Sequence, residues 1–314
     1  MKKATREAYG ETLVKLKSHD DLVVLDADLA SATKTSIFQA EYPEKHFNIG
    51  IAEADMMGTA AGLALAGKKP FASTFGIFAA GRAYEQIRNS IAYANLNVTI
   101  AATHVGITVG EDGGSHQAIE DLALMRVIPG MTIINPVDDL ETEAAIEAIL
   151  EYEGPVYLRL GRLPVERIHK IKKPFEVGKG EIVHEGKMGT IVATGLMVQE
   201  ALVAAKELAE LGIELRVINI STIKPLDNDL ILAAAKETPW LITAEEHSVI
   251  GGLGSAVAEY LSECQPTKVI KIGVQDRFGQ SGDPELLKIE YGLTSKDIVA
   301  AVKKLSGSSL TSSQ

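Results

Sequence analysis

The chain has 314 residues, a length that suggests two domains of ordinary size. Hydrophobic residues make up 46% of it and charged residues 23%, which is typical of a soluble globular protein with a full core. The net charge of −11, without a long basic stripe, argues against binding to nucleic acid or to an anionic membrane.

The first half alternates short apolar runs with longer amphipathic ones. Its N-terminus lacks the apolar segment of a signal peptide, and no uncharged apolar run in the chain reaches transmembrane length, so we expect a cytoplasmic protein. Alternating strands and helices predict a parallel α/β sheet. The predicted strands span residues 22–26, 98–102, 132–134 and 155–159, and helices are predicted at 82–92 and 140–150.

The second half repeats this pattern after a polar, basic stretch over 166–177, which we interpret as a solvated linker. Gly251–Gly254 opens a helix but lacks the spacing of a dinucleotide fingerprint. Cys264 is the only cysteine, so no internal disulfide forms. The Ser-rich segment 306–314 is predicted to be a flexible tail. Strands are predicted at 189–195, 214–219 and 241–245, with a helix at 198–211.

Polar residues follow several of the predicted strands. Parallel sheets bind ligands at the carboxyl ends of their strands, so these residues are candidates for a site at one sheet edge. Loop polar residues without such a role are common, and position alone leaves both interpretations open. The candidates are Asp28, Ser31, His104, Asp112, His116, Arg159 and Arg162.

Two acids, Glu53 and Asp55, stand in the otherwise small and apolar run 47–62. A helix rich in Ala and Gly allows close packing, and burial of a carboxyl favours its neutral, proton-donating form. Such a donor needs a basic partner atom, such as a ring nitrogen. Alternatively, both acids simply suit the dipole at the first turn of a helix.

The run 47–62 resembles the glutamate motif of the pyrimidine-binding domain in thiamine-diphosphate enzymes, and the match places the functional acid at Glu53. More broadly, residues 1–165 resemble the central domain of transketolase and residues 178–305 resemble its C-terminal domain. The resemblance implies two α/β domains, the first with a parallel sheet that binds the pyrimidine. It depends on several motifs in the same order: Ala4-Thr5-Arg6, Asp26-Ala27-Asp28-Leu29, Ile51-Ala52-Glu53, Ser73-Thr74-Phe75, Thr103-His104 and Gly110-Glu111-Asp112-Gly113.

The resemblance implies roles for residues at the cofactor. Glu53 matches the acid that contacts the aminopyrimidine ring of thiamine diphosphate and promotes the imino form, whose nitrogen takes the thiazolium proton to give the ylid. Phe75 and Phe78 match the aromatic positions that stack on the pyrimidine, although Phe78 also suits a hydrophobic core. Asp28 matches the acid near the thiazolium.

The resemblance also implies a set of substrate residues. Arg6 and Arg162 match the two arginines that hold the sugar phosphate, a task that suits the planar guanidinium fork. His104 matches the histidine beside that phosphate, and Asp112 matches the residue that binds a sugar hydroxyl.

Two further matches are weaker. His116 falls where some family members have His and others Gln, and it is expected to act in catalysis and substrate binding together with His104. Ser31 lies one position from the phosphate-binding serine of the family, so its expected contact with substrate depends on a shifted alignment.

The motif that holds the diphosphate is missing from the chain. Transketolases begin with a domain in which a Gly-Asp-Gly string and a downstream Asn hold Mg²⁺ and the diphosphate, and the nearest string here is Gly282-Asp283-Pro284. A metal that bridges a diphosphate needs a fixed shell of oxygen ligands, so we expect no metal ligands in this chain. The resemblance therefore implies a separate N-terminal subunit that carries Mg²⁺ or Ca²⁺, in an α2β2 assembly.

The function implied by the resemblance is that of a transketolase subunit. It moves a two-carbon ketol unit from a ketose phosphate to an aldose phosphate through a carbanion/enamine on thiamine diphosphate, in the pentose phosphate pathway.

Three alternative functions are less consistent with the sequence. The β subunit of a 2-oxoacid dehydrogenase E1 shares the domain pair and the glutamate, but the loop Gly110–Gln117 resembles that of transketolase. Arg6 and Arg162 also imply a phosphorylated substrate. Deoxyxylulose-phosphate synthase is another, and the spacing from Phe75 to Arg82 fits transketolase better. An assembly subunit with a decayed site is disfavoured by the intact motif residues.

Overall fold

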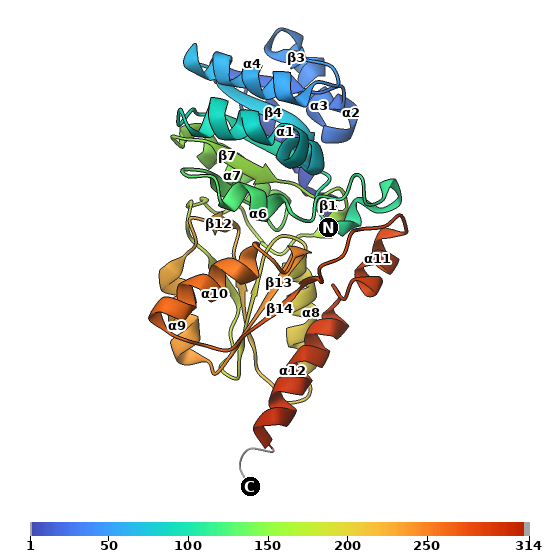
Figure 1. Cartoon of the computed structure of the whole chain (residues 1–314), viewed down its shortest axis with the longest axis vertical. Helices are drawn as coiled ribbons and strands as arrows, with labels where there is room; N and C mark the ends of the chain where they lie inside the picture. The colour runs from blue at the N-terminus through green and yellow to red at the C-terminus, as the bar shows by residue number, and fades with distance from the viewer. Residues whose placement is uncertain (1, 311–314) are drawn as a thin grey trace.

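The computed structural model describes residues 2–310, which form two α/β domains stacked end to end (Figure 1). The sheet of the first domain has seven strands. All of its neighbouring pairs are parallel except β12–β6. In spatial order the strands are β12 (Thr222–Lys224), β6 (Thr132–Ile134), β7 (Val156–Arg159), β5 (Thr99–Thr103), β4 (Lys69–Phe75), β2 (Leu22–Asp26) and β3 (His46–Asn48).

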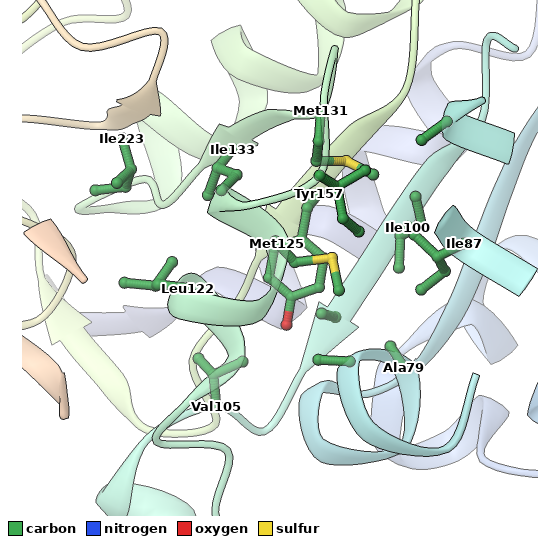
Figure 2. Close-up of a cluster of buried hydrophobic side chains, with 14 of the residues drawn as sticks. Ala79, Ile87, Ile100, Val105, Leu122, Met125, Met131, Ile133, Tyr157 and Ile223 are labelled. Atoms are coloured by element: carbon green, nitrogen blue, oxygen red, sulfur yellow. The ribbon is translucent and has the colours of Figure 1, made fainter. Parts of the chain in front are cut away.

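Helices cover both faces of this sheet because its strands are apolar on both sides. On β2, Val24 packs with the side chains of α1, α3 and α7, whereas Val23 and Leu25 pack on the opposite face with α4 and α6. On that second face Leu122 and Met125 lie near Tyr157 (Figure 2). The helices are α1 (Thr5–Lys15), α2 (Ala30–Thr33), α3 (Thr35–Glu41), α4 (Glu53–Leu65), α5 (Tyr84–Gln86), α6 (Asp121–Arg126) and α7 (Asp139–Glu151). Shorter helical segments are η1 (Pro43–Lys45), η2 (Phe78–Arg82), η3 (Ile87–Ala92) and η4 (Ile107–Asp112).

The second domain is built on a five-stranded sheet, parallel except for its edge strand β9. Its strands, in spatial order, are β14 (Val269–Val274), β13 (Leu241–Ser248), β10 (Thr190–Ala193), β11 (Arg216–Asn219) and β9 (Glu181–His184). Its helices are α8 (Met197–Ala209), α9 (Asn228–Glu237), α10 (Leu253–Cys264), α11 (Pro284–Glu290) and α12 (Ser295–Leu310). The two sheets with covering helices confirm the predicted α/β class.

The flexible tail predicted over 306–314 begins within the last helix of the structure. Helix α12 continues through Leu310, so residues 306–310 are helical, and residues 311–314 lie outside the described part of the chain. Extending a helix that has already formed is far easier than starting one, which lets it run on into a Ser-rich sequence. In the described residues, no helix combines the length and the apolar character needed to span a membrane.

Strand pairing and the linker join the two domains. β12 comes from the second half of the sequence but pairs with β6 of the first sheet, and β1 (Lys2–Ala4) pairs with β8 (Pro164–Glu166) just before the linker. The linker is not wholly solvated as predicted, because His169 is partly buried between two carboxylates. Its Nδ1 lies 2.9 Å from Asp138 and its Nε2 lies 2.9 Å from Glu181.

Candidate active site

The carboxyl ends of the central strands meet at one edge of the first sheet. β2, β4 and β5 are in register there, with Asp26 opposite Ser73 and Phe75 opposite Thr103. The loops and helices that follow these ends carry most of the predicted site residues. This is the edge at which parallel sheets place ligands.

Glu53 is the first residue of α4, and its side chain is only 1% exposed. Both of its carboxylate oxygens lie 2.9 Å from Nη1 of Arg82. Asp55, by contrast, is exposed, so only Glu53 is the buried acid of this motif. Apart from Glu53, the buried face of α4 consists of Met and Ala side chains, so the acid stands on an apolar face.

A row of aromatic rings connects the region of Glu53 with His104. The rings of Phe75 and Phe78 are stacked, with centroids 5.8 Å apart and planes inclined by 8°. Phe75 also stacks on His104 at 3.8 Å, while His116 meets Phe78 edge-on at 5.4 Å. The guanidinium of Arg82 lies 4.4 Å from the centroid of the Phe78 ring, which closes the connection to Glu53.

His104 is held in one tautomer by its two neighbours. Its backbone φ is +53°, a conformation that is uncommon outside glycine and occurs often at functional sites. Nε2 lies 3.1 Å from Nη1 of Arg6, and Nδ1 lies 2.9 Å from Oγ1 of Thr103. Since a guanidinium only donates, Nε2 must accept and Nδ1 carries the proton. Burial and the charges of Arg6 and Arg162 lower the pKa of His104 to about 3, so the ring is neutral at physiological pH.

Positive charge is concentrated around His104. Burial lowers its pKa most, and four neighbouring groups lower it further. These four residues form the cation cluster: Arg6, Arg162, His116 and Lys34. Burial and Arg162 also lower the pKa of Arg6, whose buried Nε has no hydrogen-bond partner in the described structure. An unsatisfied guanidinium donor among several cations is suited to an anion such as a phosphate or sulfonate.

The glycine-rich loop lies beside this cluster. Nη1 of Arg162 donates to the carbonyl of Val109 and lies 3.4 Å from Oε2 of Glu111 and 3.9 Å from Oδ2 of Asp112. Asp112 is exposed at the end of η4, and His116 is half-buried against Phe78. The structure therefore brings Asp112 beside Arg162 and His116 against the aromatic rings of Phe75 and Phe78.

Asp28 and Ser31 lie in the segment after β2, and both are exposed. Asp28 has a φ of +62°, and its carboxylate Oδ1 lies 3.3 Å from Nδ2 of Asn48 at the end of β3. Ser31 immediately precedes Ala32, whose carbonyl accepts a hydrogen bond of 2.7 Å from Arg6. Ser31 is thus close in sequence to the cation cluster.

Arg159 does not belong to this site. Its side chain is buried, and its Nε lies 2.8 Å from Oδ2 of Asp121 in α6. Its Nη2 also donates to the carbonyl of Glu246 in the second domain. The last side chain of a strand can lie on either face of the sheet. That of Arg159 lies on the face toward the second domain and not at the site.

Two residues of the site were not predicted from the sequence, Arg82 beside Glu53 and Lys34 near His104. Arg82 served only as a spacing marker, although its position four residues after Phe78 in a helical segment is the spacing at which side chains meet. Lys34 adopts a φ of +72° between α2 and α3, and no local pattern indicated its place beside His104.

Across the described residues, no group of His, Cys, Asp or Glu side chains is arranged to hold a metal ion. Asp283, from the string nearest to Gly-Asp-Gly, accepts hydrogen bonds from the backbone N–H groups of Glu285 and Leu286. This acid therefore caps the first turn of α11.

Comparison with known proteins gives matches over nearly the whole chain. Residues 1–166 match the family model of the transketolase pyrimidine-binding domain, and residues 178–298 match that of the transketolase C-terminal domain. A 6-deoxy-6-sulfo-D-fructose transketolase subunit from Clostridium sp. is 45% identical over 301 residues, which cover 96% of this chain and 94% of that protein.

Two solved structures share the fold. A split gene transketolase, described as an inactive β4 tetramer, superposes with a TM-score of 0.90 at 55% identity and covers 96% of this chain and 97% of its own. The transketolase of Campylobacter jejuni superposes with a TM-score of 0.82 at 25% identity, and 97% of this chain matches 47% of it. Both domains match transketolase family models, and two relatives that are single subunits match over nearly their whole length. The chain therefore belongs to the transketolase family of thiamine-diphosphate-dependent enzymes, as a homologue of its separately encoded subunits.

Proposed function

We propose that this chain is the C-terminal subunit of a two-subunit transketolase that moves a ketol unit from a ketose phosphate to an aldose phosphate, in the cytoplasmic pentose phosphate pathway. The observation that carries the proposal is the continuous row from the buried carboxyl of Glu53, through Phe78 and Phe75, to the cations around His104. One end suits a basic heteroaromatic ring, and the other suits the anionic end of a sugar.

The Glu53 end fits the aminopyrimidine of thiamine diphosphate. A buried carboxyl can exchange a proton with a ring nitrogen, and the stacked pair Phe75 and Phe78 offers an apolar surface to a flat ring. When bound, the cofactor supplies the carbanion chemistry that side chains lack. In this proposal Glu53 holds a proton at the ring nitrogen, the phenylalanines orient the ring, and Asp28 lies toward the thiazolium.

The residues around His104 are assigned to the sugar substrate. Arg6 and Arg162 hold the anionic group of the sugar, for which the orphaned Nε of Arg6 is already desolvated. His104 lies beside that group and moves a proton at a sugar hydroxyl together with His116. Asp112 accepts from another hydroxyl because it is exposed on the loop next to Arg162.

Ser31 is assigned to the substrate as well. It directly precedes the residue whose carbonyl orients Arg6, so its hydroxyl can reach the same anionic group.

A partner subunit completes the enzyme in this proposal. It brings the ligands for Mg²⁺ or Ca²⁺ and for the diphosphate, and the two chains form an α2β2 assembly. The C. jejuni transketolase that this chain matches extends well beyond the matched 47%, which leaves room for the missing half on a second chain. The related split gene transketolase is described as inactive when it forms a β4 tetramer, which is consistent with a dependence on another subunit.

The proposal is tested by co-expressing this chain with a chain that carries the Gly-Asp-Gly diphosphate-binding half. The complex is expected to transfer a ketol unit from xylulose 5-phosphate to ribose 5-phosphate, whereas the purified chain alone is inactive. Glu53→Gln should nearly abolish turnover and slow exchange of the cofactor's C2 proton. Asp55→Asn, an exposed acid in the same turn, is the matched control.

Several outcomes would contradict the proposal. Full activity of the chain alone would exclude the split assembly, and unchanged C2 exchange in Glu53→Gln would remove its assigned role. Acylation of a lipoyl domain from a 2-oxoacid would favour the 2-oxoacid dehydrogenase family instead. A sulfonated ketose as donor, tested beside xylulose 5-phosphate, identifies which anion the cation cluster prefers, because a related subunit is named for a sulfosugar.

A further inference from the structure

The loop that carries Asp112 and His116 is fastened to the second domain by a buried acid. Glu246 is on β13, and its side chain is buried. Its Oε1 accepts a hydrogen bond of 2.6 Å from the backbone N–H of Thr108, at the start of η4. The first N–H groups of a helix have no partner within the helix, so this carboxylate satisfies a donor that would otherwise be buried alone.

The space beside Gly106 is filled by the same carboxyl group. A Cβ atom on Gly106 would lie 2.3 Å from both Cδ and Oε1 of Glu246, and Gly106 has a φ of +77°. Only glycine tolerates both that conformation and that approach. The chain turns at Gly106 directly over the carboxyl, which fixes where η4 begins.

The far end of the loop is fastened as well, although by other groups. Nε2 of Gln117 donates to the carbonyls of Ile107, at 3.0 Å, and of Gln280, at 2.9 Å. Oγ of Ser281 donates to the carbonyl of Glu111 at 2.5 Å. The Gln117 contact with Ile107 ties the end of the loop to its beginning, and the contacts with Gln280 and Ser281 hold its end. Glu246 is the side chain that holds the N–H of Thr108 at its beginning.

The backbone of Glu246 meets the ion pair at the domain junction. Nη2 of Arg159 donates to the backbone carbonyl of Glu246 at 3.0 Å while Arg159 is paired with Asp121. The backbone at Glu246 is therefore held by the first domain at the same point where its side chain holds the loop. A change in the side chain alone leaves this ion pair intact.

We propose that Glu246 is a positioning residue of the active site, which acts from the C-terminal domain by fixing the segment 106–112. It touches no reacting atom. By anchoring Thr108 it keeps Asp112 beside Arg162 and keeps His116 against Phe78. The anchoring itself is independent of the proposed function, while its effect on sugar binding depends on that function.

Hydrogen–deuterium exchange on the purified chain tests the anchoring directly. Glu246→Ala is expected to raise amide exchange in peptides over 106–112 by about tenfold, since the hydrogen bond that holds the N–H of Thr108 is lost. Glu246→Gln keeps an acceptor oxygen and should exchange like the wild type. Glu246→Asp shortens the side chain by one methylene, which moves the carboxylate away from Thr108. It replaces the alanine variant in this experiment if that variant does not fold, with the same expected result.

The matched control is Glu245, an equally buried neighbour on the same strand. Its carboxylate accepts from the N–H groups of Leu253 and Gly254 at the start of α10 and is not bonded to the loop. Glu245→Ala should therefore raise exchange at α10 and leave 106–112 unchanged. Wild-type exchange over 106–112 in both Glu246→Ala and Glu246→Asp would overturn the proposal.

Steady-state kinetics of the two-subunit complex test the consequence. Glu246→Asp and Glu246→Ala should raise KM for the sugar phosphates by about tenfold with a smaller change in kcat, because the loop must be reordered when substrate binds. Glu246→Gln should restore KM. An unchanged KM in variants with faster loop exchange would refute the role in the site, whereas an inactive wild-type complex would instead count against the proposed function.

Discussion

Both carboxylate oxygens of Glu53 lie 2.9 Å from one nitrogen of Arg82, and the same guanidinium covers the ring of Phe78. The pair is asymmetric, because the side chain of Glu53 is 1% exposed and that of Arg82 is 50% exposed. Arg82 therefore compensates a buried charge from a position that is half in water. Its long side chain can move into solvent and release the carboxyl to another partner.

Removal of Arg82 should destabilise the chain. Losing one partner of a fully buried ion pair costs about 3–5 kcal/mol, and the half-exposed position of Arg82 reduces the expected loss in the free energy of unfolding to about 1–3 kcal/mol. Arg82→Gln should show this loss in urea denaturation, and adding Glu53→Gln should recover part of it. Arg88→Gln, an exposed arginine that contacts Asn89, is the control. Equal stability of the two arginine variants would contradict the expectation.

The two arginines of the cation cluster should contribute to binding of the substrate anion. In the two-subunit complex, Arg6→Ala and Arg162→Ala should each raise KM for phosphorylated sugars about ten- to a hundred-fold, which corresponds to a loss of about 1.5–3 kcal/mol per charge-assisted contact. The KM for hydroxypyruvate, which has no phosphate, should change little. Equal effects on both donors would show that the arginines act on the fold or the chemistry instead.

His104 should remain neutral throughout the physiological range. Its pKa in the folded chain is lowered to about 3 from an ordinary value near 6.5, so below pH 6.5 the unfolded chain binds a proton that the folded chain does not. Its contribution to stability is therefore complete above pH 6.5 and declines as the pH falls toward 3. NMR of the histidine side chains, assigned with His104→Gln, should show no titration of His104 between pH 5 and 8.

His169 should behave in the opposite way. The hydrogen bond to Asp138 raises its pKa to about 9, against the effect of burial. Its stabilising contribution is therefore complete below about pH 6.5 and is lost as the pH rises through 9. Urea denaturation at pH 6, 7.5 and 9.5 should show stability falling with pH in the wild type and a flatter dependence in His169→Gln. The same slope in both proteins would exclude this role.

The sequence was a good guide where the pattern was local. The strands at 22–26 and 132–134 were predicted with the bounds that the structure has, because each is a short apolar run in the interior of a parallel sheet. Strand β12 was not predicted, since its partner β6 is in the other domain and nothing in residues 222–224 indicates that pairing.

In the site, too, residues in local motifs could be predicted and residues that act through long-range contacts could not. Motif resemblance indicated Glu53, Phe75 and His104, and the structure places them along one row of contacts, although their roles remain proposals. It could not indicate Glu246, because that residue acts through a backbone N–H that lies 138 positions away in the sequence. Arg159 was assigned to the sheet edge from its position after a strand, whereas its buried pairing with Asp121 depends on the tertiary fold.

The pairing of β12 with β6 makes the two domains one folding unit. Cutting the chain within the linker would remove β12, one of the two neighbours of β6, and leave a row of unpaired backbone groups at the edge of the first sheet. Such an exposed edge promotes aggregation with other chains. The first domain is therefore a poor candidate for expression by itself, and the two halves should be lost together in a single cooperative transition.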